Sequence, residues 1–430
     1  MKFSLFIASA IFTFFLAGCS AVAVNAPESS AINIALAVNV RTLGAKGDGK
    51  TDDTPAFLAA IEKAHAGEGI VLVPKGKYLI SKSLDIEKLT LTGSGAGAWP
   101  ADVDTLPSII PIHRDGPAII IGKGGFLRGI DITYNWKTEP TNGPAAVVIT
   151  GVGAIVRDVR IMYAWDGILA DGKNNIGRMD IENVFLKDIR NVGVRITGTW
   201  DASRLQRVEV WNTRNLKYKF LPGVGFILGK NDMLHITDCF VHGMRIGFKI
   251  IDKIEDCKIE GGTWAVMNGC ATDYCTKGIL VSGAGRHRIT VNGGSFWNHE
   301  ESLIVSAGEK ARVRVSGSEL KSNGDAVVRV NSCDNTVITG CTLLRSMKRF
   351  DFPAVVLKGG NVVFGSNFIE SHGPGIIIEQ GVNSAIITGN LIECVDKKTA
   401  IVDNTISKSA IVIESNAITT VPKEPVKVAK

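Results

Sequence analysis

The chain has 430 residues, a formal net charge of +6 and a hydrophobic fraction of 45%. About 380 residues lie between an apolar N-terminus and a polar tail, which is long for one ordinary core and normal for an array of repeats. The charge excess is mild, and no run of Lys and Arg with interleaved aromatic residues occurs. This composition argues against a nucleic acid as partner.

The N-terminus is predicted to be a secretion signal. Lys2 supplies a positive charge, and the apolar run at residues 3–16 is too short to span a membrane comfortably. The run ends in Leu-Ala-Gly-Cys, which resembles the lipobox of bacterial lipoproteins. An ordinary signal peptide with an incidental cysteine is the alternative.

The lipoprotein resemblance implies that residues 1–19 are removed or modified and that Cys19 carries the lipid. Ser20, in place of aspartate, implies an outer-membrane location in the bacterial cell envelope. Residues 20–38 are small and polar and are predicted to be a tether. The protein is then held to the membrane by its lipid anchor alone.

An acidic, glycine-rich loop at residues 44–53 precedes the first predicted helix. Thr54 is a suitable N-cap with Pro55 at the first helical position, and a helix is expected over residues 55–65. Residues 69–81 then predict a strand, a turn and a second strand. A calcium site in the loop is the alternative reading, but no further acidic ligand follows at loop spacing.

Two phrases recur along the rest of the chain. The first is a small residue followed by alternating apolar residues, as in GILA at 167, GVRI at 193 and GFKI at 247. The second is a short alternating strand that ends in a Gly, Asn, Ser or Cys turn, as in LHITDCFV and AIITGNLI. Together they predict rungs of three short strands and three turns, each of about 20 to 30 residues. Such rungs coil into a parallel β-helix.

Three asparagines fall at one turn position of successive rungs. Asn367, Asn390 and Asn416 are predicted to stack and to hydrogen-bond along the axis. This turn separates the second strand of a rung from the third. The GILA-like phrases are therefore the first strands.

Residues 40–81 resemble the N-terminal signature of the pectate-lyase-like superfamily: the GAKGDGKTDDT loop, a helix, and the strand pair GIVLVPKGKYLI. The resemblance implies an all-β fold, a right-handed single-stranded parallel β-helix with an N-terminal capping helix. The β-helix domain is expected over residues 39–418, with 39–81 as the cap, and residues 419–430 form a flexible tail. About eleven or twelve rungs are expected from residue 82 onward.

The chain has eight cysteines. Cys270 and Cys275 have the spacing to close a small disulfide loop in an oxidising compartment. Cys239 and Cys341 fall at equivalent repeat positions, where buried small residues are expected. No paired C-x-x-C motif predicts a zinc site.

In the superfamily, substrate usually lies along the outer face of the first strands. Period-two alternation predicts these residues to point inward: Ile168, Val194, Ile196, Phe226, Leu228, Phe248 and Ile250. It predicts these to point outward: Leu169, Arg195, Ile227, Lys249 and Leu280. Arg195 and Lys249 are expected two rungs, about 10 Å, apart, which suits neighbouring carboxylates of a uronate chain.

The segment MYAWDGILADG carries the richest set of polar and aromatic residues. Asp166 before Gly-Ile is similar to the catalytic aspartate in the N-T-D-G-I motif of polygalacturonases. The next rung reads NVGVRI where that family has a pair of aspartates, which weighs against an inverting hydrolase. Tyr163, Trp165 and Asp171 are predicted to bind substrate, and packing of Trp165 under a loop is the alternative.

β-Elimination requires a cation or metal beside the uronate carboxylate and a base for the neighbouring proton. The predicted catalytic set is Asp166, Arg195, His242, Arg245 and Lys249. The exposed cations among them have solvated surface positions as the alternative reading. All five are expected to line one groove.

A second column of charges is predicted on the second strands: Asp131, Arg160, Asp180, Glu209, His235 and Lys258. Its alternating signs favour a salt-bridged ladder over a hydrolase pair of Asp180 and Glu209. The segment at 297–302, with His299, Glu300 and Glu301, is a weaker candidate for cation or sugar binding.

The leading hypothesis is a surface-anchored enzyme that cleaves an acidic, uronate-containing polysaccharide by β-elimination. A glycoside hydrolase on the same scaffold and a non-catalytic glycan-binding or structural surface protein are the alternatives. No cofactor is required by the pattern, and Ca²⁺ stays open. The expected partner is an acidic polysaccharide, and both a monomer and a trimer fit the sequence.

Overall fold

The computed structural model describes residues 36–94, 106–172, 176–213, 221–345, 352–406 and 410–420. The predicted signal, Cys19 and nearly all of the tether lie outside these residues, as does the tail from residue 421. The chain from Ala37 onward forms one compact unit. Among the described helices, none is long and apolar enough to cross a membrane.

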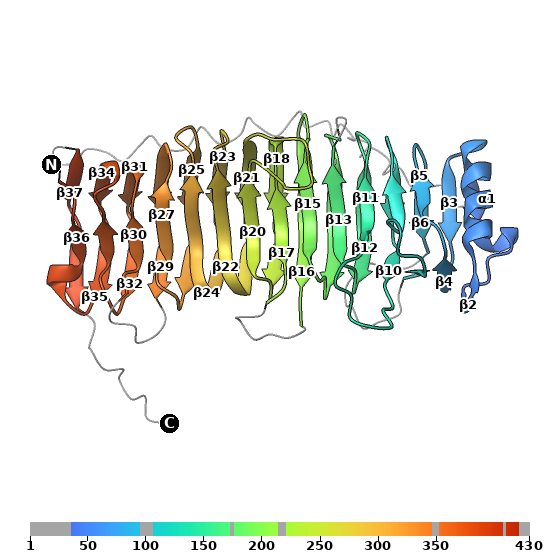
Figure 1. The fold of residues 1–430 in the computed structure, drawn as a ribbon, viewed down its shortest axis with the longest axis horizontal. Coiled ribbons are helices and arrows are strands. Elements are labelled where there is room, and N and C mark those ends of the chain that lie inside the picture. Colours follow the sequence, from blue (N-terminus) through green and yellow to red (C-terminus); the bar gives the residue numbers. More distant parts are fainter. Residues whose placement is uncertain are drawn as a thin grey trace, which may run out of the picture. The chain divides into compact units, whose positions relative to one another are not determined.

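This unit is a coil of parallel strands, which confirms the predicted fold (Figure 1). It has about 14 rungs in all, and the described residues from 82 onward supply 13 first-sheet strands, slightly more than the eleven or twelve rungs expected there. Some rungs are short: Val355 and Ile376 begin first strands of successive rungs only 376 − 355 = 21 residues apart.

The strands form three parallel sheets, which we name in the order in which each rung enters them. The first sheet contains β5 (Leu84–Ile86), β8 (Ile119–Ile121), β11 (Ala145–Ile149), β13 (Asp166–Asp171), β15 (Val192–Thr197), β17 (Val224–Leu228), β20 (Ile246–Ile251), the later parts of β22 (Ala271–Gly283) and β24 (Ser295–Ala307), β27 (Val328–Ser332), β30 (Val355–Leu357), β33 (Ile376–Ile378) and β36 (Ile401–Asp403).

The second sheet begins near the N-terminus of the unit. It contains β1 (Val38–Asn39), β3 (Ile70–Val73), β6 (Thr90–Gly93), β9 (Phe126–Arg128), the first parts of β12 (Ile155–Met162), β14 (Asp180–Lys187) and β16 (Ser203–Trp211), then β18 (Asn231–Thr237), β21 (Thr263–Asn268), β23 (Arg288–Asn292), β25 (Arg312–Ser316), β28 (Asn335–Thr339), β31 (Gly360–Gly365), β34 (Val382–Thr388) and β37 (Ile411–Glu414).

The third sheet completes each rung. It contains β2 (Asp48–Asp52), β4 (Lys77–Ile80), β7 (Ser108–Pro111), β10 (Asp131–Thr133), the later parts of β12, β14 and β16, β19 (Phe240–His242), the first parts of β22 and β24, β26 (Glu319–Ser322), β29 (Thr342–Arg345), β32 (Phe368–Ser371), β35 (Leu391–Cys394) and β38 (Ala417–Thr420).

The predicted pleat of the first strands is confirmed. Ile168, Val194, Phe226 and Phe248 are fully buried in the core, and the rings of Phe226 and Phe248 stack with centroids 4.9 Å apart. Burying such side chains stabilises each rung through its neighbours, by about 1.5–3 kcal/mol for each large apolar side chain.

The bend between the second and third sheets explains the recurring turn residues. Asp158, Asn183 and Asp238 occupy it with φ of 56°, 53° and 52°, and Gly269 and Gly293 occupy it in later rungs. This left-handed conformation favours glycine, with asparagine and aspartate next. The bend takes a single residue, so a long strand such as β12 runs through it.

The predicted asparagine ladder is confirmed, and its residues directly follow the bend residue of each rung. The Asn367 side-chain amide donates to Asn390 Oδ1 over 3.0 Å, and that of Asn390 donates to Asn416 Oδ1 over 2.9 Å. Asn390 Oδ1 also accepts the backbone N–H of Asn367. The ladder satisfies backbone groups that the bend turns inward.

Replacing Asn390 with leucine is expected to lower the free energy of unfolding by about 1–3 kcal/mol, because a buried N–H of Asn367 loses its acceptor. Asn390 is 1% exposed. Asn404→Leu, at an exposed asparagine outside the ladder, is the matched control and should cost less. Chemical denaturation of both variants measures the difference, and equal losses would contradict the ladder's role.

Helix α1 (Thr54–His65) confirms the predicted helix, while its capping role stays a prediction. The predicted N-cap was off by one residue: Asp53 precedes the helix, and Thr54 is its first residue. The carboxylate of Asp53 accepts from the backbone N–H groups of Lys46 and Gly47, so it closes the loop rather than the helix.

The other loop aspartates are bound in the same local way. Asp48 accepts from the N–H groups of Lys50 and Thr51, and these bonds lower its pKa to about 2. Asp52 accepts from Thr54 and from the Ser81 hydroxyl. These bonds fit the reading of the loop as the start of the helix.

The suggested disulfide between Cys270 and Cys275 is wrong, since both thiols are free. The two residues flank the third-sheet part of β22, which spans residues 271–273, so an extended strand separates them. Cys239 and Cys341 are buried, at 1% and 2% exposure, as predicted.

The predicted second-strand column is also wrong. Asp180 lies on the second sheet in register with Arg204, whereas Asp131, Arg160 and Glu209 lie on the third sheet. A single-residue bend joins the second sheet to the third within one continuous strand. Counting every second residue along such a strand therefore assigns residues of both sheets to one column. Lys258 lies outside the strands.

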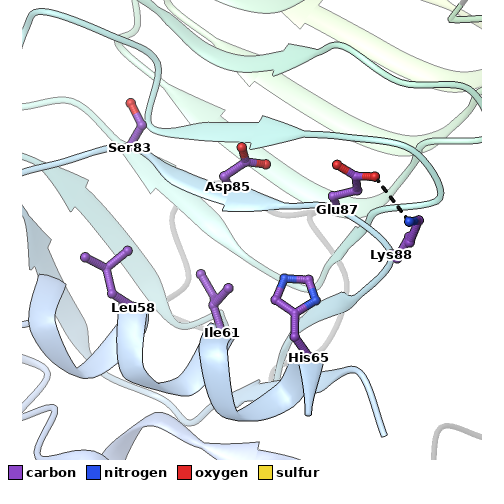
Figure 2. Close-up of a pocket in the computed structure, with 7 residues that line it drawn as sticks. All are labelled: Leu58, Ile61, His65, Ser83, Asp85, Glu87 and Lys88. Carbon is purple, nitrogen blue, oxygen red and sulfur yellow. Dashed lines mark ion pairs between the residues drawn. The ribbon is translucent and has the colours of Figure 1, made fainter. Parts of the chain in front are cut away.

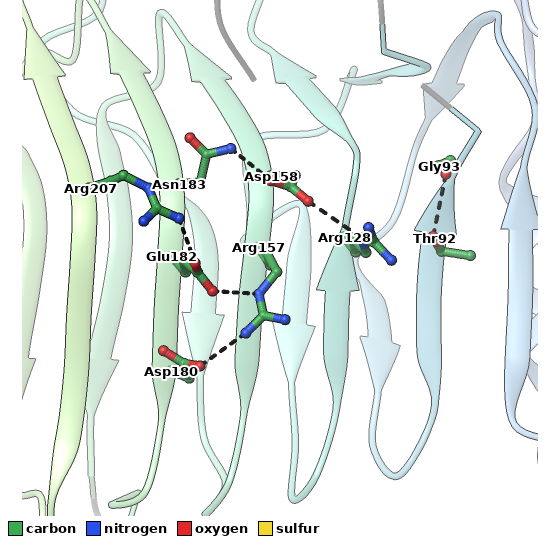
Figure 3. A network of polar contacts seen from close by, with 9 residues as sticks. All are labelled: Thr92, Gly93, Arg128, Arg157, Asp158, Asp180, Glu182, Asn183 and Arg207. Carbon is green, nitrogen blue, oxygen red and sulfur yellow. Dashed lines mark hydrogen bonds and ion pairs between the residues drawn. The ribbon is translucent and has the colours of Figure 1, made fainter. Parts of the chain in front are cut away.

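Of the predicted column, Asp131 and Arg160 do form a salt bridge, on the third sheet, and Asp180 joins a network of salt bridges on the second sheet (Figure 3). Arg157 contacts Asp180 over 3.2 Å and Glu182 over 2.7 Å, and Arg207 contacts Glu182 from the next rung. Arg128 contacts Asp158 in the same way. Acids and bases balance along this stretch.

Candidate active site

The outer face of the first sheet carries the predicted row of side chains. Leu169, Arg195, Ile227, Lys249 and Leu280 are successive partners in register. Arg195 and Lys249 are therefore two rungs apart on one face, as predicted. Apolar side chains between the cations give this face a mixed character that suits a sugar chain.

Asp166 begins β13 and is 9% exposed. Its register partners are Ala145 and Val192, so apolar groups flank it along the sheet. Its Oδ1 accepts from the Asn191 side-chain amide and from the Val192 N–H, each over 2.9 Å. Burial raises the pKa of Asp166 to about 6, although these two bonds and Arg195 act to lower it.

Arg195 lies between two carboxylates. Its Nε donates to Asp171 Oδ1 over 3.0 Å, and one Nη donates to Asp171 Oδ2. The other Nη donates to both carboxylate oxygens of Asp256, over 3.0 and 3.1 Å. The side chain of Arg195 is only 12% exposed, so it holds carboxylates in place rather than offering a free cation to solvent.

Asp256 was not predicted. It lies in the connection between β20 and β21, which folds back so that Asp256 reaches Arg195 and Ile259 approaches Gly198. The sequence signal was the unusual length of this connection, which contains the charged run DKIEDCKIE. Asn191, which binds Asp166, was also missed.

Lys249 differs from Arg195 in having no ion pair with any residue that the structure describes. It is half-buried between Ile227 and Leu280. A lone ammonium on this face is available to a carboxylate of a bound chain.

Tyr163 and Trp165 lie in the turn that enters β13, as predicted. The carbonyl of Tyr163 accepts from Trp136 Nε1 over 2.6 Å and from Arg190. Trp165 is half-buried, and its carbonyl accepts from the Asn191 N–H. The turn therefore holds Asn191 beside Asp166.

His242 lies on a different sheet from Asp166 and Arg195, and Arg245 precedes a first-sheet strand. His242 ends β19 on the third sheet, where it stacks on Trp211 with centroids 4.7 Å apart. Its Nδ1 lies 3.1 Å from the carbonyl oxygen of Asn212. Arg245 is exposed in the turn before β20.

The 297–302 segment forms a charged cluster later on the first sheet. Glu301 contacts Arg329 over 3.2 Å and Lys277 over 3.9 Å, and Glu300 contacts Lys277. Over the described parts of the chain, no group of three or more His, Cys, Asp and Glu side chains is arranged to hold a metal ion.

A separate pocket lies between α1 and β5 (Figure 2). It is lined by Leu58, Ile61, His65, Ser83, Asp85, Glu87 and Lys88. Burial, and then the charge of Glu87, raises the pKa of Asp85. Asp85 is in register with Ile120, so the pocket is at the N-terminal end of the same sheet face, three strands before β13. Its two carboxylates do not suit a uronate.

The parallel coil is thus a β-helix with a cluster of carboxyl groups on the outer face of its first sheet, a fold shared with carbohydrate-active relatives. The family described as rhamnogalacturonase A/epimerase, pectate lyase-like, matches residues 37–107. This match and the parallel β-helix confirm the resemblance of the chain to the pectate-lyase-like superfamily.

Relatives support this assignment. A polygalacturonase of Prunus persica is 43% identical over 151 residues, which is 33% of this chain and 34% of the relative. A glucan 1,3-beta-glucosidase of Cochliobolus carbonum is 22% identical over 368 residues, 82% of this chain and 40% of the relative. The chain thus spans less than half the length of these relatives.

A solved structure shares the fold. The N-terminal fragment of gene product 12 from bacteriophage phi29 superposes with a TM-score of 0.63 at 16% identity, covering 89% of this chain and 70% of the fragment. At this identity the likeness concerns the fold alone.

Proposed function

We propose that the protein cleaves an acidic polysaccharide on the outer face of the first sheet and that Asp166 is the proton donor. The observation that carries the proposal is the pairing of a buried Asp166, with a pKa raised to about 6, and two carboxylates held by Arg195. Carboxyl groups with different environments on one face are the acid and base of glycosidases.

In the proposed step, the Asp166 proton moves to the glycosidic oxygen as the bond from that oxygen to the anomeric carbon breaks. Water adds to the anomeric carbon, and its proton passes to the carboxylate of Asp256, whose charge also acts on Asp166. Arg195 positions both carboxylates. Lys249 binds a uronate carboxylate further along the chain.

The class of substrate is inferred from the positive charges on the outer face of the first sheet and from the names of the relatives. The outward cations favour a polyanion, and the polygalacturonase relative is named for a polyuronate substrate. Polygalacturonate is therefore the first substrate to test, with alginate as a second polyuronate and a neutral glucan as the control. Release of reducing ends from a polyuronate alone is the expected result, and release from the glucan alone would contradict it.

β-Elimination is the second candidate, and the unpaired state of Lys249 among the described residues favours it. There the base removes the proton beside the uronate carboxylate, the glycosidic oxygen leaves, and the new end carries a double bond. Ultraviolet absorbance of the unsaturated product separates this outcome from hydrolysis. Binding without either signal supports a non-catalytic surface protein.

Lys249→Ala is expected to raise KM for a polyuronate by about three- to tenfold, because one exposed charge pair contributes about 1 kcal/mol. Stability should change by less than about 0.5 kcal/mol. Lys358→Ala, an exposed lysine after β30, is the control with the same charge change. Equal KM values for the two variants would remove Lys249 from the site.

We also propose that Cys19 is lipidated and tethers the β-helix to the outer membrane of a bacterium. The lipobox sequence supports this proposal. Cys19→Ala should leave unprocessed precursor or a soluble periplasmic form. Normal cleavage with continued membrane fractionation of that variant would contradict lipidation.

A further inference from the structure

The outer face of the second sheet differs in charge balance between its two halves. In the half shown in Figure 3, Arg128, Arg157 and Arg207 all contact acidic side chains. Every arginine drawn there thus has a carboxylate partner at 3.4 Å or less.

The later half has a run of arginines instead. Arg288 of β23 and Arg312 of β25 are direct partners in register, and Arg314 follows two residues later on the same face. All three are exposed, as is Arg286 in the preceding turn. Like charges in register destabilise a sheet.

Among the described residues, one of these four arginines has an acidic partner. Arg312 contacts Asp334 at 3.7 Å. Within the described ranges, Arg286, Arg288 and Arg314 form no ion pair. An external anion could therefore pair with these three arginines without displacing an acidic side chain of the described chain.

An exposed aromatic ring adjoins these arginines. Trp264 of β21 is in register with Arg288 and is 41% exposed. We call this surface, Trp264, Arg286, Arg288, Arg312 and Arg314, the arginine face. Guanidinium forks match carboxylates, and an indole ring offers a flat apolar surface to a sugar.

We propose that the arginine face binds a chain of acidic polysaccharide at a second site, away from the first sheet. Adjacent strands space Arg288 and Arg312 by about 4.8 Å, and Arg312 and Arg314 are about 7 Å apart along the strand. A polymer with one carboxylate on each sugar meets such an array at several points. The class of polymer rests on the proposed function; the existence of the site does not.

A nucleic acid fits this surface less well. Single-stranded nucleic acids require successive aromatic platforms for their bases. The arginine face has Trp264 alone, with Val266 and Thr290 as its next outward neighbours. Charge and ring together therefore favour an acidic glycan.

A polymer that is bound at the arginine face has a raised local concentration at the first sheet of the same molecule. The arginine face should hold a long chain near the coil while the first sheet acts on another part of it. Its loss should weaken activity on long polymers and leave activity on short oligosaccharides unchanged.

The test is affinity electrophoresis through gels that contain polygalacturonate, at two salt concentrations. The proteins carry Asp166→Asn so that the polymer is not cut during the run. The test variant adds Arg288→Gln and Arg314→Gln. The matched control adds Arg128→Gln and Arg207→Gln, which removes the same charge from paired arginines of the same sheet.

The test variant is expected to bind about three- to thirtyfold more weakly than the parent, since two exposed charges each contribute up to about 1 kcal/mol. The difference should shrink at high salt, and the control should bind like the parent. Melting curves of both variants check that they are folded.

Equal retardation of the test variant and its parent would overturn the site. Retardation by single-stranded DNA as strong as by polygalacturonate, and equally sensitive to the test variant, would overturn the assignment to a glycan. Binding through the arginine face by a protein that cuts no polyuronate would keep this site and remove the proposed function. Cleavage of a polyuronate without binding at the arginine face would keep the proposed function and remove this second site.

Discussion

Asp166→Asn is expected to reduce turnover of a polyuronate by about 10²–10⁴-fold, the usual contribution of a general acid. Asparagine keeps the shape and one oxygen acceptor, so the Asn191 and Val192 donors stay satisfied. Initial rates of reducing-end release measure the effect. Asp115→Asn, at an exposed aspartate far along the sequence, is the control.

The same substitution, Asp166→Asn, is expected to raise the free energy of unfolding at neutral pH although it lowers turnover. The pKa of Asp166 is raised from 3.8 to about 6 in the fold, so its charged form is disfavoured there. The stabilisation is present below pH 4 and is lost as the pH rises through about 6. Above that pH, Asp166→Asn should be more stable than the parent by up to about 3 kcal/mol.

The activity of the parent should follow the same group. If Asp166 must carry a proton, kcat should fall as the pH rises above about 6. Asp166→Asn is expected to fold, because asparagine keeps an acceptor for the Val192 N–H. If the variant loses both its fold and its activity, the result contradicts a purely catalytic role for Asp166.

Arg160→Met is expected to cause the largest loss of stability, about 3–5 kcal/mol, by leaving a buried charge unpaired. Arg160 Nε contacts Asp131 Oδ1 over 3.0 Å, and the two side chains are 3% and 4% exposed. Methionine fills similar space but offers no donor. Denaturant unfolding measures the loss.

Two comparisons make this prediction specific. The double variant Asp131→Asn with Arg160→Met should recover much of the stability, since no charge is then buried alone. Arg157→Met, in the partly exposed network of the second sheet, should lose about 1 kcal/mol or less. Equal losses for Arg157→Met and Arg160→Met would contradict the account.

The sequence predicts the first sheet well because its alternation is uninterrupted. The small residue that opens each first strand marks the phase, so the inward position of Val194 and the outward position of Arg195 follow. The three asparagines are also predictable, because only a stacked turn gives them the same place in successive rungs.

The second and third sheets were harder to separate. Asn183 and Arg207 bend β14 and β16 without ending them, so Asp180 and Glu209 look alike in sequence although they lie on different sheets. Asp256 has no periodic signal, because its position depends on how a long connection folds across neighbouring rungs. The partners of Arg195 are therefore known only from the structure.

Cleavage of polygalacturonate in water enriched in heavy oxygen distinguishes hydrolysis by Asp166 from β-elimination. Hydrolysis places one oxygen from water on each new reducing end, and mass spectrometry of the products detects it. The account predicts this label in products of the parent protein and a large loss of all product with Asp166→Asn. Unlabelled products with an unsaturated end, or labelled products at an undiminished rate from Asp166→Asn, would contradict it.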